Sequence, residues 1–198
     1  SRNTRELADT RRPETLALAL DALPPAEIRR HAPALLVRGS LAHLTGRWEE
    51  AEADLRRAGR LQPTATVASQ IQARLVRLHL QRGHFETCLR AGRRALAAGR
   101  GCQAVDRGLI LSSLGVAAAS RGRLQQGADF LRQALVTARR RGDLALEGRC
   151  HYLLAANIHY LQGDLDAGLA AARQARDLYR ELGRGDLACH AEGVLGFI

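Results

Sequence analysis

Two cysteine–histidine pairs are the most obvious candidates for chemistry in this sequence. Cys150-His151 and Cys189-His190 combine residue types that bind transition metals. Neighbouring residues on a helix point about 100° apart, so the two side chains of one pair diverge and cannot chelate one ion. No C-x-x-C pair and no tetrahedral ligand spacing occur. We therefore expect no metal site, but reduced and buried thiols at Cys88, Cys102, Cys150 and Cys189.

No combination of residues points to catalysis. Gly99-Arg100-Gly101 lacks the Lys and Ser/Thr of a phosphate-binding loop and is typical of a turn between helices. Arg-Gly-Asp triplets at 141–143 and 184–186 resemble an adhesion motif, but a Gly that ends one helix and an Asp that caps the next explain both. Catalytic triads assemble only in space, and no motif with a mechanism indicates one. The sequence predicts a protein that is not an enzyme and has no cofactor.

Arginine supplies all of the basic charge. The net charge is +10, and all 30 basic residues are Arg. Four of them lie ten residues after a repeated glycine, and we call them the convex stripe: Arg56, Arg93, Arg132 and Arg173. Such a stripe could contact the phosphates of a nucleic acid. Aromatic residues that could stack on bases are nearly absent from that face, so direct nucleic-acid binding is disfavoured against a solvated surface.

The repeated glycine defines the elements that position these side chains. It occurs at Gly46, Gly83, Gly122 and Gly163, with spacings of 37, 39 and 41 residues. Two residues later stands a large apolar residue, at Trp48, Phe85, Leu124 and Leu165. Five and twelve residues later stand small ones, at Ala51, Cys88, Gly127 and Gly168 and at Ala58, Ala95, Ala134 and Ala175. These positions share one stripe of a helix, so we expect the large residue to wedge between helices and the small ones to allow close packing. The glycine suits the left-handed position that ends a helix.

These signals divide the chain into helix-turn-helix units. We expect helix pairs at 33–63, 65–100, 104–141 and 144–182, a partial first unit at about 14–32 and a truncated further unit at 186–198. The chain is 46% hydrophobic but only 4% aromatic, which favours helices packed through small side chains. The expected fold is all-α, a single domain built as a right-handed α-solenoid of paired helices.

The unit from Leu36 to Pro63 resembles a tetratricopeptide repeat (TPR). The shared positions are Gly39, Gly46, Trp48, Ala51, Leu55, Ala58 and Pro63. The later units are longer than the usual repeat of about 34 residues, and in this they are similar to those of MalT-like bacterial transcription activators, the large ATP-binding LuxR regulators. Residues 19–58 resemble the passage that opens the helical sensor arm of those proteins. The resemblance implies an arm that receives a signal between an NTPase domain and a DNA-binding helix-turn-helix domain.

The first helix of each pair lines the concave face of such a solenoid. Its polar positions form the predicted groove: Ser40, His43, Gln70, Arg77, Gln81, Ser112, Ser120, Asn157 and Tyr160. They give a neutral, hydrogen-bonding surface with one cation, Arg77, which suits a polar small molecule or a peptide backbone. The sequence leaves open whether these residues contact a ligand or are ordinary solvated side chains.

The expected function is a non-catalytic receiver domain of a bacterial transcription regulator, which binds a small-molecule effector or a protein or peptide partner in the groove. A free-standing TPR adaptor that docks peptides is the alternative. No segment approaches the roughly 20 apolar residues that cross a bilayer, and we expect a cytoplasmic protein. The chain begins without Met and ends in an apolar run, so we expect a piece of a longer protein whose exposed end repeats could form homodimers.

Overall fold

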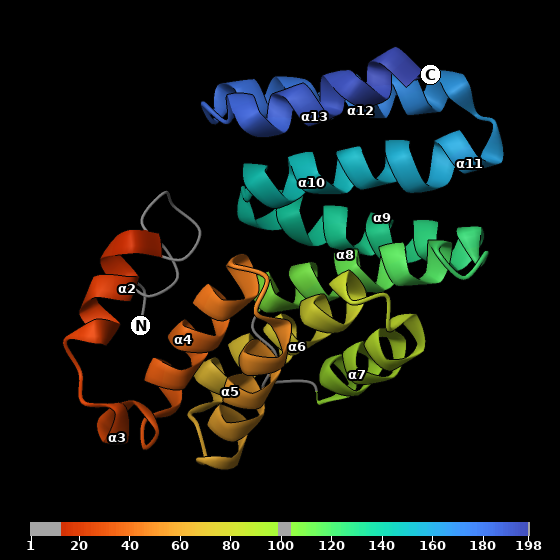
Figure 1. The fold of residues 1–198 in the computed structure, drawn as a ribbon. Coiled ribbons are helices and arrows are strands. Elements are labelled where there is room, and N and C mark those ends of the chain that lie inside the picture. Colours follow the sequence, from red (N-terminus) through yellow and green to blue (C-terminus); the bar gives the residue numbers. More distant parts are fainter. Residues whose placement is uncertain (1–12, 99–103, 198) are drawn as a thin grey trace.

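The computed structural model describes residues 13–98 and 104–197, and in these ranges every regular element is helical (Figure 1). The chain has an all-α, solenoid-like fold in which successive helices stack on one another. The helices are α2 (Pro13–Asp21), α3 (Pro25–Ile28), α4 (Ala32–Leu44), α5 (Trp48–Arg60), α6 (Ala65–Gln81), α7 (Phe85–Ala97), α8 (Ala104–Ala119), α9 (Leu124–Arg141), α10 (Leu144–Leu154), α11 (Tyr160–Gln162), α12 (Leu165–Glu181) and α13 (Gly185–Phe197). The predicted turn at Gly99-Arg100-Gly101 and Cys102 lie outside the described residues.

The repeated glycines end the first helix of each pair, as the spacing predicts. Gly46, Gly83, Gly122 and Gly163 have φ angles between 72° and 75°, which a residue with a Cβ adopts only under strain. The backbone therefore reverses at the same point in each pair, and the second helix always begins two residues later.

The two Arg-Gly-Asp triplets differ in the structure. In the first, Gly142 has a φ angle of 63° and Asp143 caps α10, since its carboxylate accepts a hydrogen bond from the Leu146 amide at 3.0 Å. In the second, the prediction that Gly185 ends a helix is wrong. Gly183 ends α12 with a φ angle of 65°, so Gly185 is already the first residue of α13.

Small residues let the helices approach closely where they cross. The side chains of Ala51, Cys88 and Ala134 have no exposed surface. At the crossing of α8 and α9, a Cβ atom added to Gly127 would lie 2.8 Å from the carbonyl oxygen of Gly115, closer than such atoms can approach. The contact therefore requires glycine at this position.

The large residue after each turn covers the core less completely than the repeat predicts. Phe85 and Leu124 are partly buried and pack against core clusters. Trp48 remains 38% exposed and Leu165 45% exposed. As the first residue of its helix, each lies at the rim of the stack, so it cannot be enclosed on all sides.

The core is a chain of clusters, each formed between neighbouring pairs, as is typical of stacked repeats. One cluster joins α4 to α5 and α6, the next joins α6 to α7 and α8, and a third joins α8 and α9 to the helix that follows. Among the described helices, none combines the length and apolar character of a membrane span.

The first helix of the fourth pair contains a π-helical turn. Residues Ala155–His159 continue α10 into α11 without a break, and the Tyr160 amide donates to the Ala155 carbonyl five residues earlier. Gly163 then ends the helical run at its usual place.

Candidate functional site

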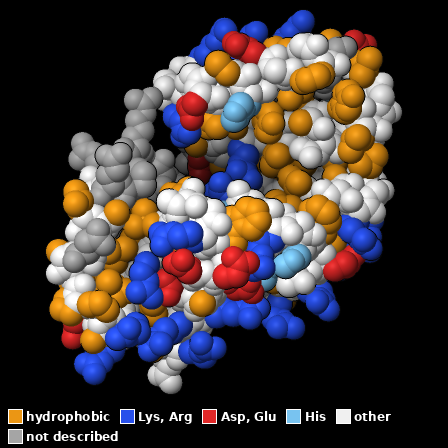
Figure 2. Space-filling view, viewed as in Figure 1, with side chains coloured by type: hydrophobic (Ala, Val, Ile, Leu, Met, Phe, Trp, Pro, Cys, Tyr) orange, Lys and Arg blue, Asp and Glu red, His pale blue; other side chains and the backbone are white. Residues whose placement is uncertain are grey.

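The concave face holds a cavity of about 410 Å³. Figure 2 shows a hollow on this face, with basic and acidic side chains inside it. The residues that line it come from the first helix of each pair and from α2, α12 and α13: Leu16, Leu36, Val37, Ser40, Leu41, His43, Leu44, Gln70, Ala73, Arg74, Arg77, Asp106, Leu109, Asp143, Ala145, Leu146, Arg149, Tyr179, Arg184 and Leu187. An occupant would therefore contact elements from both ends of the stack.

The N-terminal part of the predicted groove lies in this cavity. Ser40, His43, Gln70 and Arg77 all line it. The Ser40 hydroxyl donates to the Leu36 carbonyl at 2.7 Å, and the His43 ring is hydrogen-bonded to Gln81 from the next pair. Burial lowers the pKa of His43, so this ring is neutral at pH 7 and adds no charge to the cavity.

The C-terminal part of the predicted groove does not line the cavity. Ser112 is fully buried, because α8 packs against α6, α7, α9 and α10 and has little free surface. Its hydroxyl donates to the Leu109 carbonyl at 3.0 Å. Ser120 lies exposed beyond the end of α8. The Asn157 side-chain amide donates to the Leu153 carbonyl at 3.3 Å. Tyr160 is 49% exposed and lies outside the cavity lining.

Four arginines line the cavity, whereas the sequence predicts one. The prediction of a neutral surface with Arg77 as its one cation is wrong, since Arg74, Arg149 and Arg184 also line the cavity. Arg149 lies in the first helix of the 144–182 pair, which the sequence predicts to line the concave face, so this cation could be predicted from the sequence. Nothing in the repeat pattern marked it, because the four concave arginines do not share one offset from the turn glycines.

The two aspartates of the cavity are occupied by other groups. Asp106 is buried and accepts a hydrogen bond from the Ser69 hydroxyl at 2.7 Å. Asp143 caps α10. Arg184 makes two hydrogen bonds to Asp186, at 2.9 and 2.8 Å.

Arg74 and Arg149 have a different environment. Both side chains are half-buried, and neither is hydrogen-bonded or ion-paired to any residue in 13–98 or 104–197. The Nε atom of Arg149 is buried and has no hydrogen-bond partner in the described part of the chain. A buried donor that has lost water and gained no acceptor is costly, so this site favours a ligand that supplies one.

A second cavity of about 230 Å³ adjoins the first between α10, α12 and α13. Arg149, Tyr179 and Leu187 line both cavities, and Tyr152, Leu153 and His190 complete the second. The Tyr179 ring lies against Gly148, and burial raises its pKa to about 12, so it is a neutral phenol at pH 7. Arg149 is thus the cation that both cavities share.

The convex stripe is exposed along its whole length. Arg56 Nη2 lies 2.7 Å from Glu52 Oε1, and Arg132 Nη1 lies 3.3 Å from Asp129 Oδ1. Arg93 donates to the Gln126 amide oxygen at 3.3 Å, while Arg173 has no polar partner among the residues described. These are solvated side chains with neighbours on their own surface.

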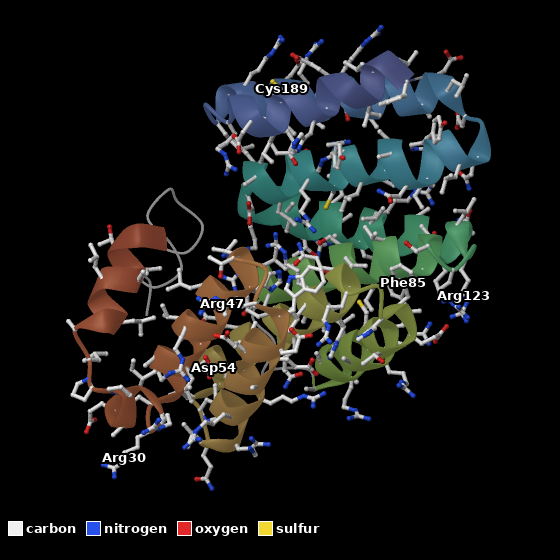
Figure 3. The ribbon with its side chains drawn as sticks, viewed as in Figure 1. Arg30, Arg47, Asp54, Phe85, Arg123 and Cys189 are labelled. Carbon is white, nitrogen blue, oxygen red and sulfur yellow. The ribbon has the colours of Figure 1, made fainter. Side chains whose placement is uncertain are left out.

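The cysteines are partly as predicted. Cys88 and Cys150 are buried, and burial raises the pKa of each to about 12, which leaves an unreactive thiol. Cys189 is exposed, so its predicted burial is wrong: it stands on α13, the outer helix of the stack (Figure 3). Within the described ranges, no three His, Cys, Asp or Glu residues are grouped as metal ligands.

No protein-family model matches the sequence, and no curated protein matches it either. The fold is similar to that in the crystal structure of BtubC (BKLC) from P. vanneervenii, with a TM-score of 0.62. The match covers 93% of this chain and 87% of the other at 16% sequence identity. At that identity the similarity concerns the helical fold alone.

Proposed function

We propose that this chain is a non-catalytic, TPR-like receiver domain of a bacterial transcription regulator, whose concave cavity takes an effector or a partner. The cavity is the observation that supports a binding role. Its volume of about 410 Å³ lies in the range of small-molecule sites, about 300–1,000 Å³, and apolar walls with a few charged groups are typical of such sites.

The regulatory part of the proposal rests on the sequence. Residues 19–58 resemble the start of the sensor arm in MalT-like activators, and the later units are lengthened in a similar way. In such a protein the arm works in the bacterial cytoplasm and contacts an NTPase domain and a DNA-binding domain of the same chain.

The position of the cavity suggests how binding would be transmitted. A ligand that contacts Ser40 on α4 and Leu187 on α13 favours the curvature of the stack that keeps both in reach. The equilibrium shifts by the difference between the ligand's affinities for the two curvatures, so a tight ligand that binds both equally would transmit nothing.

The binding role is tested by screening polar small molecules and extended peptides for an increase in the melting temperature, followed by titration calorimetry. We expect saturable, salt-tolerant binding of a small molecule that is weakened by Arg77→Ala. Asn157→Ala is the matched control, because Asn157 lies outside the cavity. Binding of peptides alone would favour the free-standing adaptor, and equal effects of both substitutions would contradict a site in the cavity.

The regulatory role is tested by the coding sequence on both sides of the chain. A P-loop domain upstream and a helix-turn-helix domain downstream would support it. A start codon directly before Ser1 and a stop codon after Ile198 would overturn it and leave the adaptor.

A further inference from the structure

We infer that the ligand of the concave cavity is a small amphipathic anion, an apolar body that carries one oxyanion group. This inference rests on the proposed function, because it names the ligand class of the same cavity. It follows from two arginines, Arg74 and Arg149, that have no hydrogen-bond or ion-pair partner among the described residues, and from the apolar side chains that line the same cavity.

Arg74 and Arg149, which both line the cavity, are the candidates for binding the anionic end. Both residues are half-buried, and neither is ion-paired to a described carboxylate. Within the same residues, the buried Nε of Arg149 has no acceptor. A guanidinium group presents several N–H donors in one plane and binds carboxylate or phosphate oxygens in pairs, so an oxyanion satisfies it better than a neutral group does.

The acidic residues of the cavity do not fill this role. The Asp106 carboxylate accepts the Ser69 hydroxyl, and the Asp143 carboxylate caps α10. No carboxylate oxygen of either residue lies within ion-pair distance of Arg74 or Arg149. Among the described residues no carboxylate balances these arginines, and we assign that charge to the ligand.

The apolar end is assigned to the leucines that line the same cavity. Leu36, Leu41, Leu109, Leu146 and Leu187 line the main cavity. On the other side of Arg149, the second cavity offers Tyr152 and the neutral Tyr179. An anion without an apolar body would leave these walls in contact with water and gain little from the site.

The test uses anilinonaphthalene sulfonate, a fluorescent amphipathic anion, and N-phenylnaphthylamine, which has a similar aromatic body and no charge. We expect the sulfonate to bind at one saturable site and to be displaced by octanoate or octyl phosphate but not by octanol. Whichever of the two acids displaces it at lower concentration identifies the ligand's oxyanion as a carboxylate or a phosphate.

Substitutions locate the site. Arg74→Leu and Arg149→Leu are each expected to weaken sulfonate binding about tenfold, as the loss of a charged hydrogen bond does, and to leave N-phenylnaphthylamine binding unchanged. Arg173→Leu is the matched control, because it removes the same charge from the convex stripe. Ala145→Trp places an indole at the cavity wall from an exposed position and should block both probes.

Two results would overturn the inference. One is that octanol displaces the sulfonate as effectively as octanoate does; the other is that Arg149→Leu leaves sulfonate binding unchanged. If the neutral probe binds and Ala145→Trp blocks it, the cavity still binds ligands and the proposed function stands. If Ala145→Trp blocks neither probe and the screen finds no ligand, both proposals fail.

Discussion

The arginines of the concave cavity and those of the convex stripe carry the same charge in opposite surroundings. On the convex side, Arg56 is 59% exposed and Arg132 is 55% exposed, and each lies beside an acidic residue of its own helix. On the concave side, Arg74 and Arg149 are half-buried and line the cavity, without an acidic partner in the described chain. The convex stripe can be recognised from its regular spacing in the sequence, whereas the arginines of the cavity are recognised only in the structure.

The difference shows that the surroundings of an arginine, more than its charge, decide what it contributes. An exposed ion pair gains little, because water and salt screen it and two long side chains lose freedom. A half-buried guanidinium group has given up part of its hydration, so the group that replaces the water matters far more. We therefore expect Arg74 and Arg149, and not the convex stripe, to contribute binding energy.

The largest effect is expected at an arginine that already has a carboxylate partner. Arg38 on α4 makes two hydrogen bonds of 2.6 Å to the carboxylate of Asp54 on α5; Asp54 is labelled in Figure 3. We expect Asp54→Ala to lower the free energy of unfolding by about 2–3 kcal/mol, because it leaves a partly buried guanidinium group unpaired. Asp129→Ala, which frees the exposed Arg132, should cost at most about 0.5 kcal/mol. Urea denaturation measures both, and equal losses would contradict the comparison.

A smaller effect is expected from Asp143, one of the two aspartates that line the cavity. Asp143→Asn keeps an N-cap of similar strength but removes a negative charge, so stability should hardly change. Binding of anilinonaphthalene sulfonate should become about threefold tighter, because less repulsion opposes the anion. The fluorescence titration decides this. Unchanged binding would show that the sulfonate sits away from Asp143, and weaker binding would contradict the expected repulsion.

The smallest effect is expected from the convex stripe. Replacing Arg56, Arg93, Arg132 and Arg173 together with Gln should change the free energy of unfolding by no more than about 0.5 kcal/mol per residue. Sulfonate binding should stay the same. Binding to random duplex DNA is measured in parallel at low and high salt; strongly salt-dependent binding that the substitutions abolish would favour a nucleic-acid-binding function instead.

The sequence predicts the helices and turns well, because a residue type that the backbone requires marks each turn. Gly46, Gly83, Gly122 and Gly163 all take the left-handed conformation, and the small residues after them are buried. The cavity is harder to predict. Arg74 lies nine residues before Gly83, whereas Arg149 lies fourteen before Gly163, so no common offset relates them.

Errors in the predicted site have a physical origin too. The position of its helix predicts that Ser112 lies in the groove, but the middle of α8 is enclosed by four other helices. Sequence periodicity gives the direction of a side chain on its own helix. It does not give the curvature of the stack, and that curvature decides which helices leave a cavity between them.

The π-helical turn at Ala155–His159 gives the chain a way to vary its length inside a helix. A turn closed over five residues holds one more residue than a turn closed over four, yet Gly163 still ends the run at the same structural point. Part of the growth in spacing, from 37 to 41 residues, can thus be absorbed without any change in a connecting loop. An alignment that assumes a fixed repeat length, or allows gaps only in turns, loses register at this helix. Deleting one residue from 155–159 should restore an ordinary α-helix, a change that the rest of the stack can accommodate.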